Sequence, residues 1–298
     1  MGTPEFAVAS LDRLVQGGCN IVGVITAPDK AAGRGMQLQQ SAVKKYAVEK
    51  GLHVLQPEKL KNPAFLEELR SLKADLQVVV AFRMLPEQVW NMPPLGTINL
   101  HGSLLPQYRG AAPINWAIIN GEKETGVTTF KLQHEIDTGN ILLAEKIPIG
   151  DDETAGELHD KMKETGAALL LKTVTGIAAG TLEDRPQSNA STLRHAPKIF
   201  TETCQVDWNK TVDEVYNLIR GLSPYPAAFC FLHDKKLKIY KAEKLPQATA
   251  IPAGHLESDQ KSFLQFACSN GFIRITELQL EGKKRMPVTD FLRGYRFP

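Results

Sequence analysis

Through the first two-thirds of the 298-residue chain, short runs of β-branched and aliphatic residues alternate with segments of helical periodicity. The strand-like runs are Ile21–Ile25, Leu76–Ala81 and Thr97–His101, and the helix-like segments include Ser41–Lys50, Pro63–Leu72 and Pro113–Asn120. Such alternation is typical of βαβ units, in which helices join parallel strands of one sheet. The pattern therefore predicts an α/β fold with a doubly wound, mostly parallel, Rossmann-like sheet.

The pattern changes further along the chain. Two strands are expected at Val127–Lys131 and Ile141–Ile149, and a long helix follows the acidic run that begins at Asp151. After a segment without periodicity, one helix at Val212–Leu222 precedes several short strands with polar turns, which is typical of a small barrel. We expect a catalytic domain over residues 1–185, a linker over 186–202 and a smaller, OB-like C-terminal β-barrel over 203–298.

Composition excludes several classes of protein. The chain is 43% hydrophobic and 23% charged, as expected of a soluble globular protein. Its four cysteines form no C-x-x-C pair, so the sequence indicates neither a zinc site nor a disulfide framework. No apolar run approaches the ~18 residues of a membrane helix, and the N-terminus lacks the features of a signal peptide. We expect a cytoplasmic monomer with no metal and no membrane association. The mildly basic C-terminal third, with a net charge of +4, is compatible with nucleic acid without requiring it.

Three polar residues are candidates for chemistry. Asn99 and His101 lie two residues apart on a predicted strand, so their side chains share a face. They stand at its carboxyl end, where doubly wound sheets bind ligands. Asp137 lies in a predicted tight turn, where a carboxylate often has only a structural role. From the residues alone, a hydrogen-bonded polar strand end is the favoured interpretation of Asn99 and His101, and a structural turn is the favoured interpretation of Asp137.

Motifs around these residues indicate a family. The run from Asn99 to Pro106, followed by Asp137-Thr138-Gly139, resembles the signature of the 10-formyltetrahydrofolate-dependent formyltransferases. Further motifs resemble the branch of this family that acts on methionyl-tRNA: Met1–Val8, Gly33–Gly35, Gly110–Ile114, Ala196–Ile199, Trp208, Ile219–Pro224 and Leu278–Lys284. Together these motifs extend the resemblance over essentially the whole chain.

The resemblance implies transfer of a formyl group from 10-formyltetrahydrofolate to the amino group of initiator methionyl-tRNA. By analogy, Asn99 and His101 stabilise the tetrahedral oxyanion, His101 moves the proton, and Asp137 supports His101. Neither a metal nor a covalent nucleophile is needed. Ser103 lacks the G-x-S-x-G context of a serine nucleophile, so we interpret it as a loop residue.

The same resemblance suggests binding residues. We expect the folate to contact the loop after the second strand, which contains Phe82, Arg83, Met84 and Leu85, and the loop that contains Ser103, Leu104, Leu105 and Pro106. The family commonly has Tyr-Gly where this chain has Phe82-Arg83, so backbone contacts are favoured over the Arg83 side chain. The residues expected to contact the tRNA are Arg34, Lys198, Lys283 and Lys284, with Arg285 as a further candidate.

The sequence is compatible with two other functions. The same catalytic domain occurs in formyltransferases of sugar nucleotides and in formyl-folate hydrolases, but such small acceptors need neither the Arg34 loop nor a basic C-terminal third. A non-catalytic RNA-binding protein is the alternative from another class, and the intact set of Asn99, His101 and Asp137 argues against it.

The start of the sequence carries one more expectation. Gly2-Thr3-Pro4 resembles the turn between a first strand and a first helix, Phe6–Val15. A strand should precede that turn, and in a doubly wound sheet the first strand is usually central. We therefore expect roughly half a dozen further native residues upstream, about one strand's length. A form extended in this way should be more stable.

Overall fold

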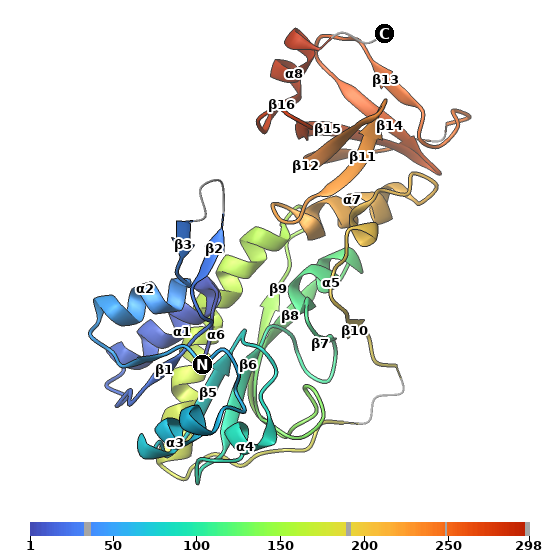
Figure 1. Cartoon of the computed structure of the whole chain (residues 1–298). Coiled ribbons are helices and arrows are strands. Elements are labelled where there is room, and N and C mark those ends of the chain that lie inside the picture. Colours follow the sequence, from blue (N-terminus) through green and yellow to red (C-terminus); the bar gives the residue numbers. More distant parts are fainter. Residues whose placement is uncertain (33–36, 189–191, 248, 296–298) are drawn as a thin grey trace. The chain divides into compact units, whose positions relative to one another are not determined.

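The computed structural model describes residues 1–32, 37–188, 192–247 and 249–295, which form two compact units (Figure 1). Unit 1 comprises residues 1–110, 126–147 and 159–195. Unit 2 comprises residues 111–125, 148–158 and 196–298. Within the described residues, no helix combines the length and apolar character needed to cross a membrane.

The main sheet of unit 1 has the strand order β5 (Gln77–Val80), β6 (Thr97–His101), β8 (Glu124–Lys131) and β9 (Ile141–Pro148). Strand β5 pairs in parallel with β6, and β6 pairs antiparallel with β8. A second parallel pair joins β1 (Val24–Ile25) to β4 (Val54–Leu55). Strand β1 is shorter than the run predicted from Ile21. The α/β fold with a sheet rich in parallel pairs is confirmed.

The helices of unit 1 are α1 (Glu5–Gln16), α2 (Ala42–Glu49), α3 (Pro63–Ser71), α4 (Glu87–Trp90) and most of α6 (Ala155–Ala178). Side chains cap the first turns of α2 and α3. The Ser41 side chain accepts a bond from Lys44 N and caps α2, while Asn62 caps α3 with proline in its first turn. The pair β2 (Lys30–Ala32) and β3 (Gln37–Gln39) flanks residues 33–36. Arg34 and its two glycine neighbours therefore lie outside the described residues.

Unit 2 contains a curled antiparallel sheet, so the predicted barrel is a half-barrel. Its strand order is β11 (Ala228–Leu232), β12 (Lys235–Pro246), β15 (Gly271–Leu280), β14 (Leu264–Cys268) and β13 (Leu256–Ser258), with β16 (Met286–Pro287) beside β15. The register of β12 against β15 shifts between Ile239 and Ala242, as a β-bulge does, and such bulges bend a strand. Strand β15 is long, and it pairs with β12, β14 and β16.

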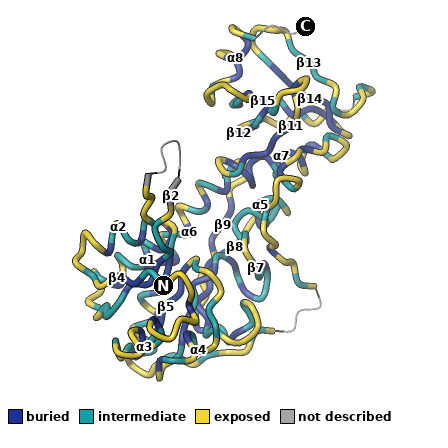
Figure 2. The backbone as a smooth tube through the Cα atoms, in the orientation of Figure 1, coloured by how far each residue is buried: buried dark blue, intermediate teal, exposed yellow. Residues whose placement is uncertain are grey.

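Helix α7 (Val212–Leu222) packs against β11, β12 and β15, and its boundaries match the prediction (Figure 1). A capping box between Thr211 and Glu214 fixes its first turn. Figure 2 shows α7 and β11 as largely buried segments of this unit. The remaining elements of unit 2 are α5 (Pro113–Ile119), a 3₁₀ turn (Glu202–Cys204) and α8 (Val288–Gly294). Helix α5 packs on α7, and Asn115 Nδ2 donates to Gly221 O at 2.7 Å.

Three of the four cysteines lie in the core of unit 2. Cys204, Cys230 and Cys268 are buried, and burial raises the pKa of the Cys230 and Cys268 thiols to about 12. These thiols stay protonated near neutral pH, whereas the reactive form of cysteine is the thiolate. These three cysteines therefore serve as packing residues of this core.

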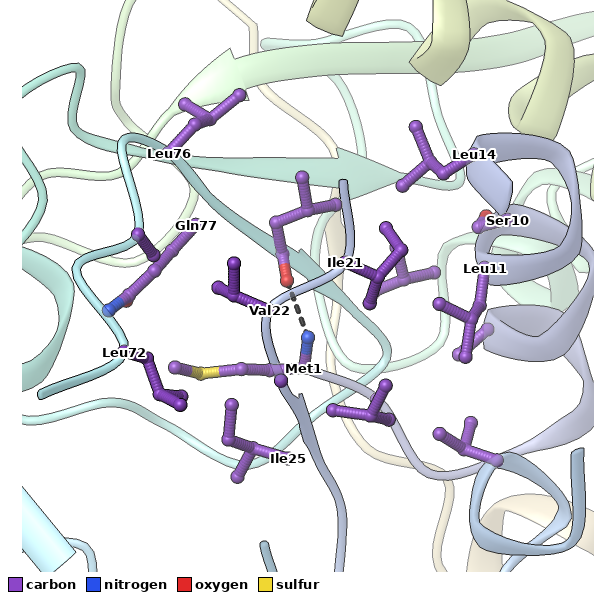
Figure 3. A pocket seen from close by; sticks show the side chains of 18 of the residues that line it. Met1, Ser10, Leu11, Leu14, Ile21, Val22, Ile25, Leu72, Leu76 and Gln77 are labelled. Carbon is purple, nitrogen blue, oxygen red and sulfur yellow. Dashed lines mark hydrogen bonds between the residues drawn. The ribbon is translucent and has the colours of Figure 1, made fainter. Parts of the chain in front are cut away.

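Met1 and Gly2 fill the space between β1 and β5. Gly2 N donates to Ile25 O at 3.1 Å on one side, and Val80 N donates to Met1 O at 2.9 Å on the other. The Met1 amino group donates to Val78 O at 2.6 Å (Figure 3). Next to them, a mostly apolar cavity of about 130 Å³ separates the segment before β1 from β5. Among its lining residues are Leu11, Leu14, Ile21, Val22 and Leu76.

The mostly apolar lining of this cavity suits one more apolar segment of chain beside Met1, which an added segment can test. Six alternating apolar residues added before Met1 should pair with both neighbours and raise the stability by about 2 kcal/mol or more, at ~1 kcal/mol for each net hydrogen bond. That corresponds to a rise in Tm of about 5 °C. A Gly-Ser extension of equal length is the control. Equal melting temperatures for the two extended forms would contradict this interpretation of the cavity.

Candidate active site

Strand β6 brings the first two candidate residues to one face of the sheet. Asn99 pairs with Val79 of β5 and with Phe130 of β8, and His101 ends the strand opposite Thr128. Asn99 is half-buried and His101 is buried. Because β5 and β6 are parallel, the loop after β5 and the end of β6 lie at the same edge of the sheet.

Two groups face the ring of His101. Its Nε2 lies 2.8 Å from the carbonyl oxygen of Tyr108, and its Nδ1 lies 3.9 Å from Oδ2 of Asp137. A carbonyl can only accept, so Nε2 carries the hydrogen of this bond. In the neutral ring Nδ1 then has a lone pair, and it is the atom that can accept a proton. Once protonated, Nδ1 would face the Asp137 carboxylate.

Asp137 occupies a constrained turn. Its φ of 56° is left-handed, a conformation that a non-glycine residue adopts only where its surroundings hold it. Gly110 N donates to Oδ2 of Asp137 at 2.9 Å, and the side chain is 12% exposed. Gly139, two residues later, lies so close to Lys131 that a Cβ there would overlap the Lys131 carbonyl. The turn thus presents one carboxylate oxygen to His101 and Gly110.

Buried hydrogen bonds fix the conformation of the loop after β6. Ser103 is fully buried, and its hydroxyl donates to Gln107 O at 2.6 Å. Thr128 Oγ1 donates to Ser103 O and accepts from Leu105 N, which ties the loop to β8. Ser103 and Leu105 therefore support the loop from inside, while Leu104 and Pro106 are half-buried.

The side chains of the loop after β5, which we expect to contact the folate, differ in exposure and in partners. Phe82 and Leu85 pack against a core cluster of unit 1, whereas Met84 is 73% exposed. The Arg83 guanidinium donates to the backbone carbonyls of Pro57 and Glu58. The Arg83 side chain is therefore engaged with a neighbouring loop, which leaves backbone groups as the polar atoms of this loop that are best suited to a ligand.

Residues that the sequence analysis missed hold the site together. Tyr108 has a left-handed φ of 58°, and its N–H donates to Arg194 O at 2.6 Å. Strand β7 (Arg109–Gly110) pairs with β10 (His195–Ala196), inside the segment predicted as a linker. Gln187 contacts both Arg109 and the Asp137 turn. The only sequence signal near them was the run of small residues that follows Arg109.

The predicted tRNA contacts on unit 2 are exposed. Lys283 and Lys284 lie in the turn after β15, and Lys198 lies 5.6 Å above the ring of Phe200. Arg285 is different, because it makes two 2.7 Å bonds to Glu277 and stacks on Tyr240. Of these four cations, Arg285 alone has both a carboxylate and an aromatic ring as partners in these contacts. Within the described part of the chain, no group of three or more His, Cys, Asp or Glu residues is placed to hold a metal ion.

The sequence of this chain is similar to the sequences of known proteins. Residues 1–174 match the family described as Formyl transferase, and residues 198–296 match its C-terminal domain. The chain is 58% identical to Methionyl-tRNA formyltransferase of Parabacteroides distasonis, over 99% of this chain and 94% of that protein. The chain belongs to the methionyl-tRNA formyltransferase family. A second member of the family, from Porphyromonas gingivalis, is 49% identical with the same coverage.

Solved structures share the fold of this methionyl-tRNA formyltransferase family member. An N-formyltransferase from Helicobacter canadensis, solved with folinic acid and dTDP-3-aminofucose, superposes with a TM-score of 0.70 at 23% identity, over 96% of this chain and 97% of that one. HypX from Aquifex aeolicus, solved with tetrahydrofolic acid, has a TM-score of 0.60 at 21% identity, over 83% of this chain and 44% of that one. At these identities the likeness supports the fold alone.

Gly139 should be essential for the geometry of this site. In Gly139→Ala, the new Cβ overlaps the Lys131 carbonyl, so the turn must shift and carry the Asp137 carboxylate away from His101. We expect formyl transfer to fall by about 10², the scale of a 1 Å misplacement. Gly294→Ala, where a Cβ meets no atom within 4 Å, is the matched control. Activity measured well below the melting temperature of each variant separates misplacement from unfolding, and parent-like activity of Gly139→Ala would contradict the expectation.

Proposed function

We propose that this protein transfers the formyl group of 10-formyltetrahydrofolate to the amino group of initiator methionyl-tRNA, in the cytoplasm. The observation that carries the proposal is the arrangement of His101 between a backbone carbonyl and the Asp137 carboxylate, with Asn99 on the same face of β6. The methionyl-tRNA formyltransferase family and the relatives' printed names support the acceptor. Solved structures with folate derivatives support a folate donor.

The proposed reaction begins with an attack of the methionyl amine on the formyl carbon. The bond formed is N–C, and the carbonyl oxygen of the formyl group becomes an oxyanion. The attacking nitrogen must lose a proton, and Nδ1 of His101 accepts it because Nε2 is already committed to Tyr108. The oxyanion then collapses, the bond from carbon to folate N10 breaks, and the proton passes from Nδ1 to N10.

Two residues stabilise charge along this path. The Asn99 amide donates to the oxyanion, and one such donor is typically worth ~2.7–4 kcal/mol. Asp137 stabilises the imidazolium that forms, because its Oδ2 faces Nδ1 at 3.9 Å. With the ring N–H at Nε2 bound to Tyr108, the neutral His101 has no free N–H for the oxyanion. It acquires one at Nδ1 only after it accepts the proton.

The two substrates would use different parts of the chain. The folate would contact backbone groups of the loop that contains Phe82, Arg83, Met84 and Leu85, and the loop from Ser103 to Pro106. The acceptor end of the tRNA would contact Arg34, and its phosphates would contact Lys198, Lys283 and Lys284. We propose residues 203–298 as the tRNA-binding domain.

One assay tests the acceptor. The protein is incubated with formyl-folate and, in separate reactions, with methionyl-tRNA, free methionine, an amino-sugar nucleotide or no acceptor. The proposal predicts formylation of methionyl-tRNA alone. Preferred formylation of the sugar nucleotide, or release of formate without an acceptor, would instead support one of the related activities, and no turnover with any acceptor would support a non-catalytic protein.

The candidate catalytic residues should act mainly on turnover. His101→Ala and Asn99→Ala should each lower kcat by at least about 10², the scale of a lost acid–base group for His101 and of a lost oxyanion donor for Asn99. Folate binding should persist, since these groups act mostly on the transition state. Asp137→Asn should also be slow, because it keeps the shape of the side chain and removes its charge. His53→Ala, a half-exposed histidine on another loop, is the control. Near-normal turnover of any of the three variants would overturn that residue's assignment.

The basic residues should act on the tRNA only. Arg34→Ala should lower kcat/KM for methionyl-tRNA while the Kd for folate stays unchanged. Lys283→Glu and Lys284→Glu should weaken tRNA binding, and losing either phosphate contact should reduce the slope of log K against log salt by about 0.7–0.9. Charge reversal suits this test better than deletion of residues 203–298, because deletion would remove the packing of α5 on α7. Lys261→Glu, also exposed in unit 2, is the control, and equal effects of all three reversals would contradict the assignment.

A further inference from the structure

Gln187 joins two parts of the site that lie far apart in the sequence. Its Nε2 donates to the carbonyl oxygens of Asp137 and Gly139, each at 2.8 Å. Its Oε1 accepts from Nε of Arg109 at 3.1 Å and from the Arg109 terminal nitrogen Nη2 at 2.6 Å. One amide thus bridges the Asp137 turn and the strand β7, 48–50 residues and 78 residues away in sequence.

The Gln187 amide stabilises the Asp137 turn on both of its sides. A left-handed φ at an aspartate is held by its surroundings, and Gln187 bonds the carbonyl of Asp137 itself. On the other side, Arg109 precedes Gly110, whose N–H binds the Asp137 carboxylate at 2.9 Å. Gln187 therefore fixes both the backbone that carries the carboxylate and the strand that receives it.

Anchoring of the 181–188 segment does not depend on this amide. Arg185 and Ile141 exchange two backbone bonds, of 2.7 and 2.8 Å, and Asn140 donates to Asp184 at 3.1 Å. A substitution at position 187 should therefore leave the segment in place and change only what the amide contacts.

We propose that Gln187 is a positioning residue for formyl transfer, which holds the Asp137 carboxylate in its place beside Nδ1 of His101. This inference rests on the proposed role of Asp137. The amide is suited to the task because a side-chain amide offers two donors to the turn and an acceptor to Arg109 at the same time. A carboxylate at position 187 could keep the Arg109 contact and would lose both donors, and a methionine would lose all of these bonds.

Steady-state kinetics of Gln187→Glu and Gln187→Met test the proposal, with Ser188→Ala, an exposed neighbour, as the control. Both Gln187 variants should lower kcat about tenfold or more, while KM for each substrate changes by less than about twofold, because a displaced carboxylate affects the transition state more than binding. Their pH–rate profiles should change in the direction seen for Asp137→Asn.

Double variants separate positioning from a general structural role. If Gln187 acts through Asp137, adding Gln187→Glu to the Asp137→Asn variant should lower kcat by less than a further factor of about two. The effects of coupled residues are not additive. Losses that multiply, or parent-like kcat in Gln187→Met, would overturn the proposal. Asp137→Asn alone reports on the underlying function: if it is as fast as the parent, the catalytic assignment of Asp137 fails, and if it is slow while both Gln187 variants are fast, only the positioning role fails.

Discussion

The hydrogen bond between His101 Nε2 and the carbonyl of Tyr108 decides which nitrogen of the ring has a lone pair. A backbone carbonyl cannot donate, so the bond places the hydrogen on Nε2 and leaves the lone pair on Nδ1, the atom proposed to act as the base. Tyr108 presents that carbonyl from a left-handed conformation, and its own N–H is bound by Arg194. The orientation of one imidazole thus depends on a segment more than 80 residues further along the chain.

Conformations that are unusual for non-glycine residues gather at the same edge of the sheet. Among the described residues, seven non-glycine positions have a left-handed φ, and three of them, Ala81, Tyr108 and Asp137, belong to the loops around the site. Each such position costs about 1–3 kcal/mol and persists where the surrounding structure holds it. Here the holding contacts are visible for two of the three: Arg194 for Tyr108, and Gln187 with Gly110 for Asp137. The strain at these loops lowers the stability of the fold, and it holds His101 and Asp137, the proposed acid–base pair, in fixed positions.

The two units position their candidate functional residues in different ways. In unit 1, β6 lies between β5 and β8, and its polar end stands where the parallel strands β5 and β6 both end. In unit 2, a curled antiparallel sheet packs on α7 and leaves Lys283 and Lys284 exposed in a turn. Arg285, beside them, is engaged by Glu277 and Tyr240. Lys283 and Lys284 are therefore better placed than Arg285 to bind a phosphate.

Periodicity and caps predicted well where local sequence decides structure. Helix α7 has the predicted boundaries because Thr211, Glu214 and a strongly amphipathic run all indicate the same start and face. Strand β6, with Asn99 and His101 at its end, was equally predictable. Gln187 was not, because its partners lie 48 or more residues away and its own segment has no periodicity. Tyr108 was missed for a related reason: its backbone carbonyl, rather than its side chain, contacts His101.

The state of the His101 ring tests this account most directly. ¹⁵N NMR of histidine-labelled protein, with His101 assigned by comparison with His101→Ala, distinguishes a protonated from an unprotonated nitrogen in the neutral ring. We predict hydrogen on Nε2 and a lone pair on Nδ1, and this tautomer should persist when a folate derivative binds. A neutral ring with its hydrogen on Nδ1 would contradict it, because the nitrogen beside Asp137 could not then accept the proton of the attacking amine.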